Sequence, residues 1–161
     1  MSTATTVLQH FTASVQRTLA VLQRLEAALT TEQTALTSAD PERLQQAVRE
    51  KLTVLADLEP LLNEREAIQK HLGVAAGPAG GDQLLASAPA DAEVRLQWEE
   101  LKTRAGNVER LNAQNGQLAL QGEKTARHAV SLLTGRPAEP ETYGRSGRSR
   151  PGLGGLPLAK A

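Results

Sequence analysis

Histidine and serine side chains are the residues of this chain whose types could support catalysis or metal binding. His10, His71 and His128 lie far apart in the sequence, with no Asp or Glu at the spacing of a metal-ligand motif. His128 and Ser131 share a helical face at i and i+3, but nothing nearby resembles an oxyanion hole or an orienting third residue. We therefore predict that the chain is not an enzyme and has no catalytic residue, metal or cofactor.

Glycine-rich segments can also carry chemistry, because their backbone N–H groups can hold phosphate. Residues 73–90 contain, among alanines, Gly73, Gly77, Pro78, Gly80, Gly81 and Pro89. A phosphate cradle needs a preceding strand, a following helix and usually a lysine at its end, and this context is missing from the sequence pattern. We predict that residues 73–90 form a loop that connects two helices.

The composition favours long helices. Of the 161 residues, only Phe11, Trp98 and Tyr143 are aromatic, so Leu, Val and Ala must build the core. Cysteine is absent, which excludes disulfides and thiolate metal sites. The N-terminus lacks the basic and apolar regions of a signal peptide, and no run reaches the ~18 apolar residues of a membrane span. We expect a soluble, cytoplasmic protein without stable membrane insertion.

The spacing of apolar residues predicts an all-α fold with three long helices, over about residues 5–37, 41–72 and 91–134. One apolar stripe runs along the first helix, formed by Leu8, Phe11, Val15, Leu22, Leu25, Leu29 and Leu36. Thr18 and Glu32 interrupt the stripe, which favours packing in a small bundle over a uniform zipper. We expect an antiparallel bundle or a coiled-coil-like hairpin, in one domain over residues 1–135.

The second helix has a clear start. Asp40 can cap it, Pro41 suits the first helical position, and Glu42 complements the helix dipole. Its apolar face is predicted to contain Leu44, Val48, Leu52, Leu55, Leu58, Leu62 and Ile68. Pro60 lies within this helix and should kink it, or else break it at Glu59. Gly73 is the predicted left-handed C-cap residue.

The third helix begins after Asp91, its predicted cap, and stops at Gly135 and Pro137. Its apolar face comprises Val94, Trp98, Leu101, Ala105, Val108, Leu111, Leu118, Ala126, Ala129, Val130 and Leu133. Trp98 should be a core anchor. A helix of this length would span roughly 65 Å, which exceeds a compact domain of this size. Part of it must therefore project, bend or pack against something else.

Residues 136–161 form a predicted flexible basic tail. Downstream of Leu133 the sequence contains five basic and two acidic residues, which gives a net charge of +3. The cations are scattered and lack interleaved aromatic residues, so the charge pattern is weak support for nucleic-acid binding, and we predict no nucleic-acid partner.

Polar and glycine residues inside the third helix set it apart from an ordinary packing helix. Asn112, Asn115, Gly116 and Gly122 occupy positions where Leu or Ala would favour a helix. Small residues can open a groove for a partner helix, and asparagine amides beside it can fix the partner's register. Alternatively, both asparagines face solvent and the glycines are merely tolerated.

Three segments carry a resemblance to a known family. They read Leu111-Asn112-Ala113-Gln114-Asn115-Gly116-Gln117-Leu118, then Ala129-Val130-Ser131-Leu132-Leu133, then Thr142-Tyr143-Gly144-Arg145-Ser146-Gly147-Arg148. In order and spacing they resemble the C-terminal signature of the FlgN family of flagellar type III export chaperones. Residues 149–161 depart from the family pattern.

The resemblance implies a cytoplasmic chaperone that binds hook-associated (hook-filament junction) proteins through their C-terminal helical segments and delivers them to the export gate. The same resemblance assigns client binding to Leu111, Asn112, Asn115, Gly116, Leu118, Ala129, Val130 and Leu133. Tyr143 would contact the cytoplasmic domain of the export gate. The alternative is a structural coiled-coil protein without a client.

Overall fold

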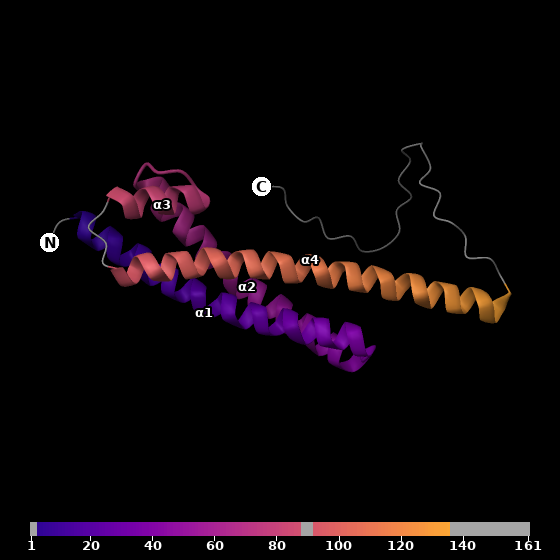
Figure 1. Ribbon diagram of the computed structural model, residues 1–161. Helices are drawn as coiled ribbons and strands as arrows, with labels where there is room; N and C mark the ends of the chain where they lie inside the picture. The colour runs from indigo at the N-terminus through magenta and orange to yellow at the C-terminus, as the bar shows by residue number, and fades with distance from the viewer. Residues whose placement is uncertain (1–2, 88–91, 136–161) are drawn as a thin grey trace, which may run out of the picture. The chain divides into compact units, whose positions relative to one another are not determined.

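The fold is all-helical in a computed structural model that describes residues 3–87 and 92–135. Its elements are α1 (Thr3–Ser38), α2 (Pro41–His71), α3 (Gly77–Ser87) and α4 (Ala92–Thr134), and no strand occurs among the described residues (Figure 1). The prediction of an all-α fold is confirmed, although the helices number four in these residues instead of three. The chain divides into two units, Met1–Thr125 and Ala126–Ala161, which are described separately.

Helices α1 and α2 form an antiparallel hairpin with a turn of two residues. Ala39 has a φ of 51°, and Asp40 accepts a hydrogen bond from the backbone N–H of Arg43 at 3.0 Å. Pro41 follows as the first helical residue. The predicted cap of the second helix is therefore confirmed.

The hairpin supplies most of the apolar core of the first unit. The predicted stripe of α1 is largely inside, and Thr18 is buried with it because its hydroxyl donates to the Ser14 carbonyl at 2.8 Å. The buried core residues are Phe11, Val15, Leu19, Leu22, Leu25, Leu29, Val54, Leu58, Leu84, Leu85, Val94, Trp98 and Leu101. A polar residue that interrupts the stripe, such as Thr18, is thus buried together with its apolar neighbours.

The buried face of α2 agrees with the prediction only in part, since Leu58 is buried and Leu62 and Ile68 pack against the core. Leu52 and Leu55 are 60% and 41% exposed, whereas Ala47 and Val54 are buried. Only a narrow stripe of α2 lies against the core, so the second row of leucines is left outside it. The helix continues through the exposed Pro60, and the alternative of a break at Glu59 is wrong.

The prediction of a loop over residues 73–90 is wrong, because α3 lies within it. Gly73, with a φ of 71°, follows the end of α2 as predicted for a left-handed cap residue. Gly80 and Gly81 lie inside α3, where an added Cβ would collide with the Ala75 carbonyl and with the Trp98 ring respectively. Close packing against other segments therefore outweighs the low helix propensity of glycine here.

Helix α4 is continuous from Ala92 to Thr134 and passes through Gly106, Gly116 and Gly122. Its buried residues are Val94, Trp98, Leu101 and Asn115. None of the helices in the described ranges is long and apolar enough to cross a bilayer.

Candidate functional site

The start of α4 is fixed by the side chain of Trp98. The indole is almost fully buried, and its ring centroid lies 5.5 Å from that of Phe11 in α1, with the planes tilted by 49°. The guanidinium carbon of Arg65 in α2 lies 5.6 Å from the ring centroid. The prediction that Trp98 anchors the core is confirmed.

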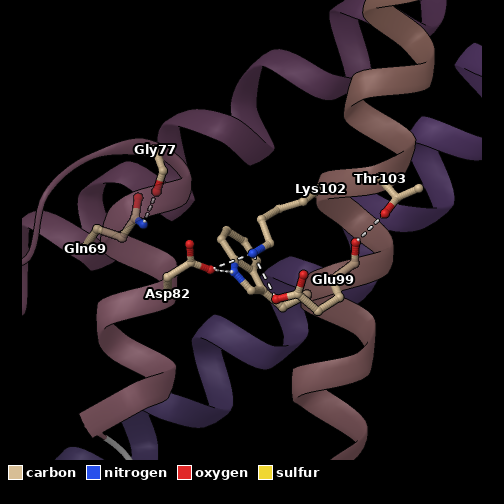
Figure 2. A network of polar contacts seen from close by, with 7 residues as sticks. Gln69, Gly77, Asp82, Glu99, Lys102 and Thr103 are labelled. Carbon is tan, nitrogen blue, oxygen red and sulfur yellow. Dashed lines mark hydrogen bonds and ion pairs between the residues drawn. The ribbon is translucent and has the colours of Figure 1, made fainter.

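Helix α3 contacts the same indole through a carboxylate. Trp98 Nε1 donates to Asp82 Oδ1 at 2.7 Å, and Lys102 Nζ donates to the same oxygen at 2.8 Å (Figure 2). Lys102 also pairs with Glu99 at 2.9 Å. The hydrogen bond from Lys102, followed by that from Trp98, lowers the pKa of the Asp82 carboxyl group. We call Asp82, Trp98 and Lys102 the indole clasp.

Further along α4, Asn115 joins a polar network that connects the three long helices. Its side-chain Nδ2 donates to the Leu29 carbonyl at 2.8 Å and to Glu32 Oε2 at 2.9 Å. Glu32 Oε1 in turn accepts from Lys51 Nζ of α2 at 2.6 Å. Asn115 is 3% exposed. We call Lys51, Glu32 and Asn115 the polar relay, which directs the Asn115 amide into the protein and away from solvent.

The other predicted client-binding residues of the first unit lie on different sides of α4. Leu111 and Leu118 are half-buried, and Leu111 packs against the hydrophobic core. Asn112 and Gly116 are exposed, and nothing lies within 4 Å of a Cβ built on Gly116. The structure therefore places Asn112 and Gly116 at the surface, while Leu111 and Asn115 face the rest of the unit.

In the second unit, the last turns of α4 carry exposed apolar side chains. Val130 is 58% and Leu133 is 86% exposed, and Ala129 is also exposed. Ala126, Ala129, Val130 and Leu133 are spaced at i, i+3, i+4 and i+7, so they share one face of the helix. We call these four residues the terminal stripe. Tyr143 lies outside the described residues.

The described ranges hold no group of three His, Cys, Asp or Glu side chains that could bind a metal. His10 and His128 are exposed on α1 and α4, and His71 is exposed at the end of α2. The arrangement can bind other protein segments through apolar and hydrogen-bonding side chains.

Several residues of these networks were not predicted as functional. Glu32 stood out because it interrupts an apolar stripe, and that interruption marks a buried polar contact. Lys51 gave no signal, since a lysine on a helix is ordinarily solvated. Gly81 and Asp82 form a glycine-acid pair whose role depends on Trp98, 16 residues further along the chain from Asp82.

The fold and these surfaces define a helical protein-interaction module with a hydrogen-bonded interior and an exposed apolar stripe. Comparison with protein families shows that residues 1–151 match the model of the FlgN protein family. The chain belongs to the FlgN family, whose members are flagellar export chaperones. No curated protein and no solved structure matched the chain.

The polar relay predicts unequal effects for the two asparagines of α4. Asn115→Ala should lower the free energy of unfolding by about 1–3 kcal/mol, because Glu32 Oε2 loses a buried donor. Asn112→Ala is the matched control, and it should leave stability unchanged or slightly raised, since Asn112 is exposed and Ala favours helices. Urea unfolding followed by circular dichroism measures both. Equal effects would show that the relay contributes no net stability.

The indole clasp predicts a dependence on pH. Because the pKa of Asp82 is lowered in the folded protein, its stabilising effect is present above the unfolded pKa of about 3.9 and is lost as pH falls through the folded value. Trp98 is the single tryptophan, so acrylamide quenching of its fluorescence reports on the clasp. Quenching should rise in acid for the wild type and rise less for Asp82→Asn, which is already loosened at neutral pH. Glu59→Gln, at an exposed site, should follow the wild type. Identical acid titrations of Asp82→Asn and the wild type would rule out Asp82 as the group responsible.

Proposed function

We propose that this chain is a cytoplasmic export chaperone that binds hook-associated proteins, prevents their premature assembly and delivers them to the type III export gate. Membership of the FlgN family supports the general role. The observation that carries the specific proposal is the terminal stripe, because Val130 and Leu133 expose apolar surface at one face of a helix.

The proposed client element is a C-terminal helical segment of a hook-associated protein. We propose that such a segment carries an apolar stripe of its own. Laying that stripe on α4 would bury both apolar surfaces in the helix-in-groove manner. The client segment must be ordered on binding, which reduces the net affinity and keeps the complex releasable.

We assign the client contact first to the exposed members of the predicted set. These are Asn112, Gly116, Ala129, Val130 and Leu133, with the half-buried Leu118 beside them. Gly116 leaves room for a close approach by a partner backbone. Asn115 bonds to α1 and Leu111 packs against the core, so a direct role for them in client binding requires α4 to move.

Tyr143 is the proposed contact with the cytoplasmic domain of the export gate. An aromatic ring with a terminal hydroxyl combines apolar contact area with a hydrogen-bonding group, which suits a small anchor in a pocket of another protein. This assignment rests on the Tyr-Gly-x-x-Gly element that the chain shares with the family pattern.

A second candidate is a structural coiled-coil protein without a client. The exposed Leu52 and Leu55 on α2 favour it, since leucines at i and i+3 can form a seam between two hairpins. Sedimentation at high concentration separates the two functions. A monomer that captures clients supports the chaperone, and a stable dimer that captures none supports the alternative.

A charge placed in the terminal stripe should disrupt client capture. Val130→Asp combined with Leu133→Asp is expected to reduce co-purification of hook-associated proteins by about tenfold or more, because a carboxylate would be buried against the client's apolar stripe. Both side chains are exposed, so the thermal melting temperature should change little. Thr103→Asp with Asn107→Asp introduces the same charge at exposed positions of α4 away from every predicted client contact and serves as the control. Normal capture by the stripe variant would place the client elsewhere.

Tyr143→Ala should separate delivery from client binding. The variant is expected to retain its client in pull-down experiments and to lose about tenfold in affinity for the cytoplasmic domain of the export gate, a typical effect of removing an aromatic anchor. Tyr143→Phe is the conservative control and should retain most of the affinity. Loss of the client with Tyr143→Ala would show that this residue belongs to the client site.

A further inference from the structure

Among the described residues, Arg65 of α2 is a buried cation that forms no ion pair. The residue is 9% exposed, and neither its Nε nor its Nη1 has a hydrogen-bond partner in the described part of the chain. Burial lowers the pKa of its guanidinium group, and the nearby charge of Glu66 offsets this shift only in part. The other flanking acid, Glu64, pairs instead with Arg17 at 2.7 Å.

The environment of Arg65 therefore does not compensate the full cost of removing its charge from water. Its guanidinium lies over the Trp98 ring, but a cation–π contact returns less free energy than removing the charge from water costs. One helical turn further on, Gln69 is fully buried, and its Oε1 has no hydrogen-bond partner among the residues that the structure describes. The face of α2 that meets Trp98 thus holds buried polar groups without hydrogen-bond partners, which are rare in protein interiors.

Helix α3 packs on this same region, and few interactions hold it there. It has 11 residues, three of them glycine, so its intrinsic helix propensity is low. Its polar attachments are the indole clasp at Asp82 and the bond from Gln69 Nε2 to the Gly77 carbonyl, at 2.9 Å (Figure 2). Leu84 and Leu85 add apolar burial. Gly81 meets the indole so closely that a side chain would not fit there.

We propose that α3 is a displaceable cover over a latent binding site formed by Trp98 and Arg65, and that its occupant is a partner-protein segment carrying a carboxylate. Asp82 shows the chemistry that the site accepts, since α3 places this carboxylate against Trp98 Nε1 and Lys102. An acidic segment in place of α3 would keep these contacts and supply the anion that Arg65 lacks. The site is separate from the terminal stripe, and the inference is independent of the client proposed for it.

Displacement of α3 is tested first, by acrylamide quenching of Trp98. Gly81→Ala should push α3 from the indole and raise the quenching constant about twofold or more, by shifting the population toward the open state. Gly106→Ala is the matched control, since nothing lies within 4 Å of its added Cβ, and it should match the wild type. Asp82→Asn removes a clasp contact without adding bulk and should act in the same direction as Gly81→Ala. Quenching constants equal to the control, or unfolding of α1 and α2 together with α3 in both variants, would overturn the proposal.

The occupant is tested with two short acetylated peptides, one of alternating Ala and Glu and one of alternating Ala and Lys, at equal ionic strength. The acidic peptide should change Trp98 emission saturably and bind Gly81→Ala about tenfold more tightly than the wild type, because less free energy is spent on opening. Arg65→Met, which removes the unpaired charge and should fold at least as stably, is expected to abolish this binding. Equal responses to both peptides, or undiminished binding by Arg65→Met, would refute the assignment of a carboxylate site.

Discussion

The burial of a single indole is the contact on which the arrangement of the first unit depends. Trp98 meets Phe11 of α1, Arg65 of α2, and Gly81 with Asp82 of α3, so one side chain of α4 touches each of the other helices. Phe, Trp and Tyr occur once each in the chain, so few rings are available for this position. The absence of a side chain at Gly81 and the carboxylate at Asp82 are conditions for this packing.

The polar relay supplies the second fixed point of α4 on the hairpin. Asn115 lies 17 residues after Trp98, about 26 Å further along the helix axis. Apolar stripes can slide past one another at small cost, whereas the bonds of Asn115 to Leu29 and Glu32 form at one register only. A fully apolar contact of the same size would often be as stable or more so, and the polar contact adds register specificity. The ion pair of Arg104 with Glu26 lies between the two fixed points.

The sequence allowed the long helices to be predicted because their signals are local. Caps and prolines are short-range features, and the Asp40-Pro41 start of α2 follows from them. The continuity of α4 through Gly116 and Gly122 did not follow from the sequence, because glycine is a poor helix former. Helix α3 could not be found in this way, since its glycines are poor helix formers, and Gly80 and Gly81 are required by close contacts with the Ala75 carbonyl and the Trp98 ring respectively. The same reason applies to Asn115. Its type suggested a surface groove, but the distant acceptors Leu29 and Glu32 draw it into the interior.

The size of the terminal stripe limits how it can hold a client. Burying Val130 and Leu133 would contribute about 3–6 kcal/mol in total, whereas micromolar binding needs about 8 kcal/mol after the costs of ordering are met. In the proposed function, a client held at that strength must therefore cover further apolar surface of the second unit, where Leu132 is 71% exposed. An interface built from a few modest contacts dissociates readily. In the proposed function, release at an export gate would then need only competition for part of the client segment, with no nucleotide-driven step in the chaperone itself.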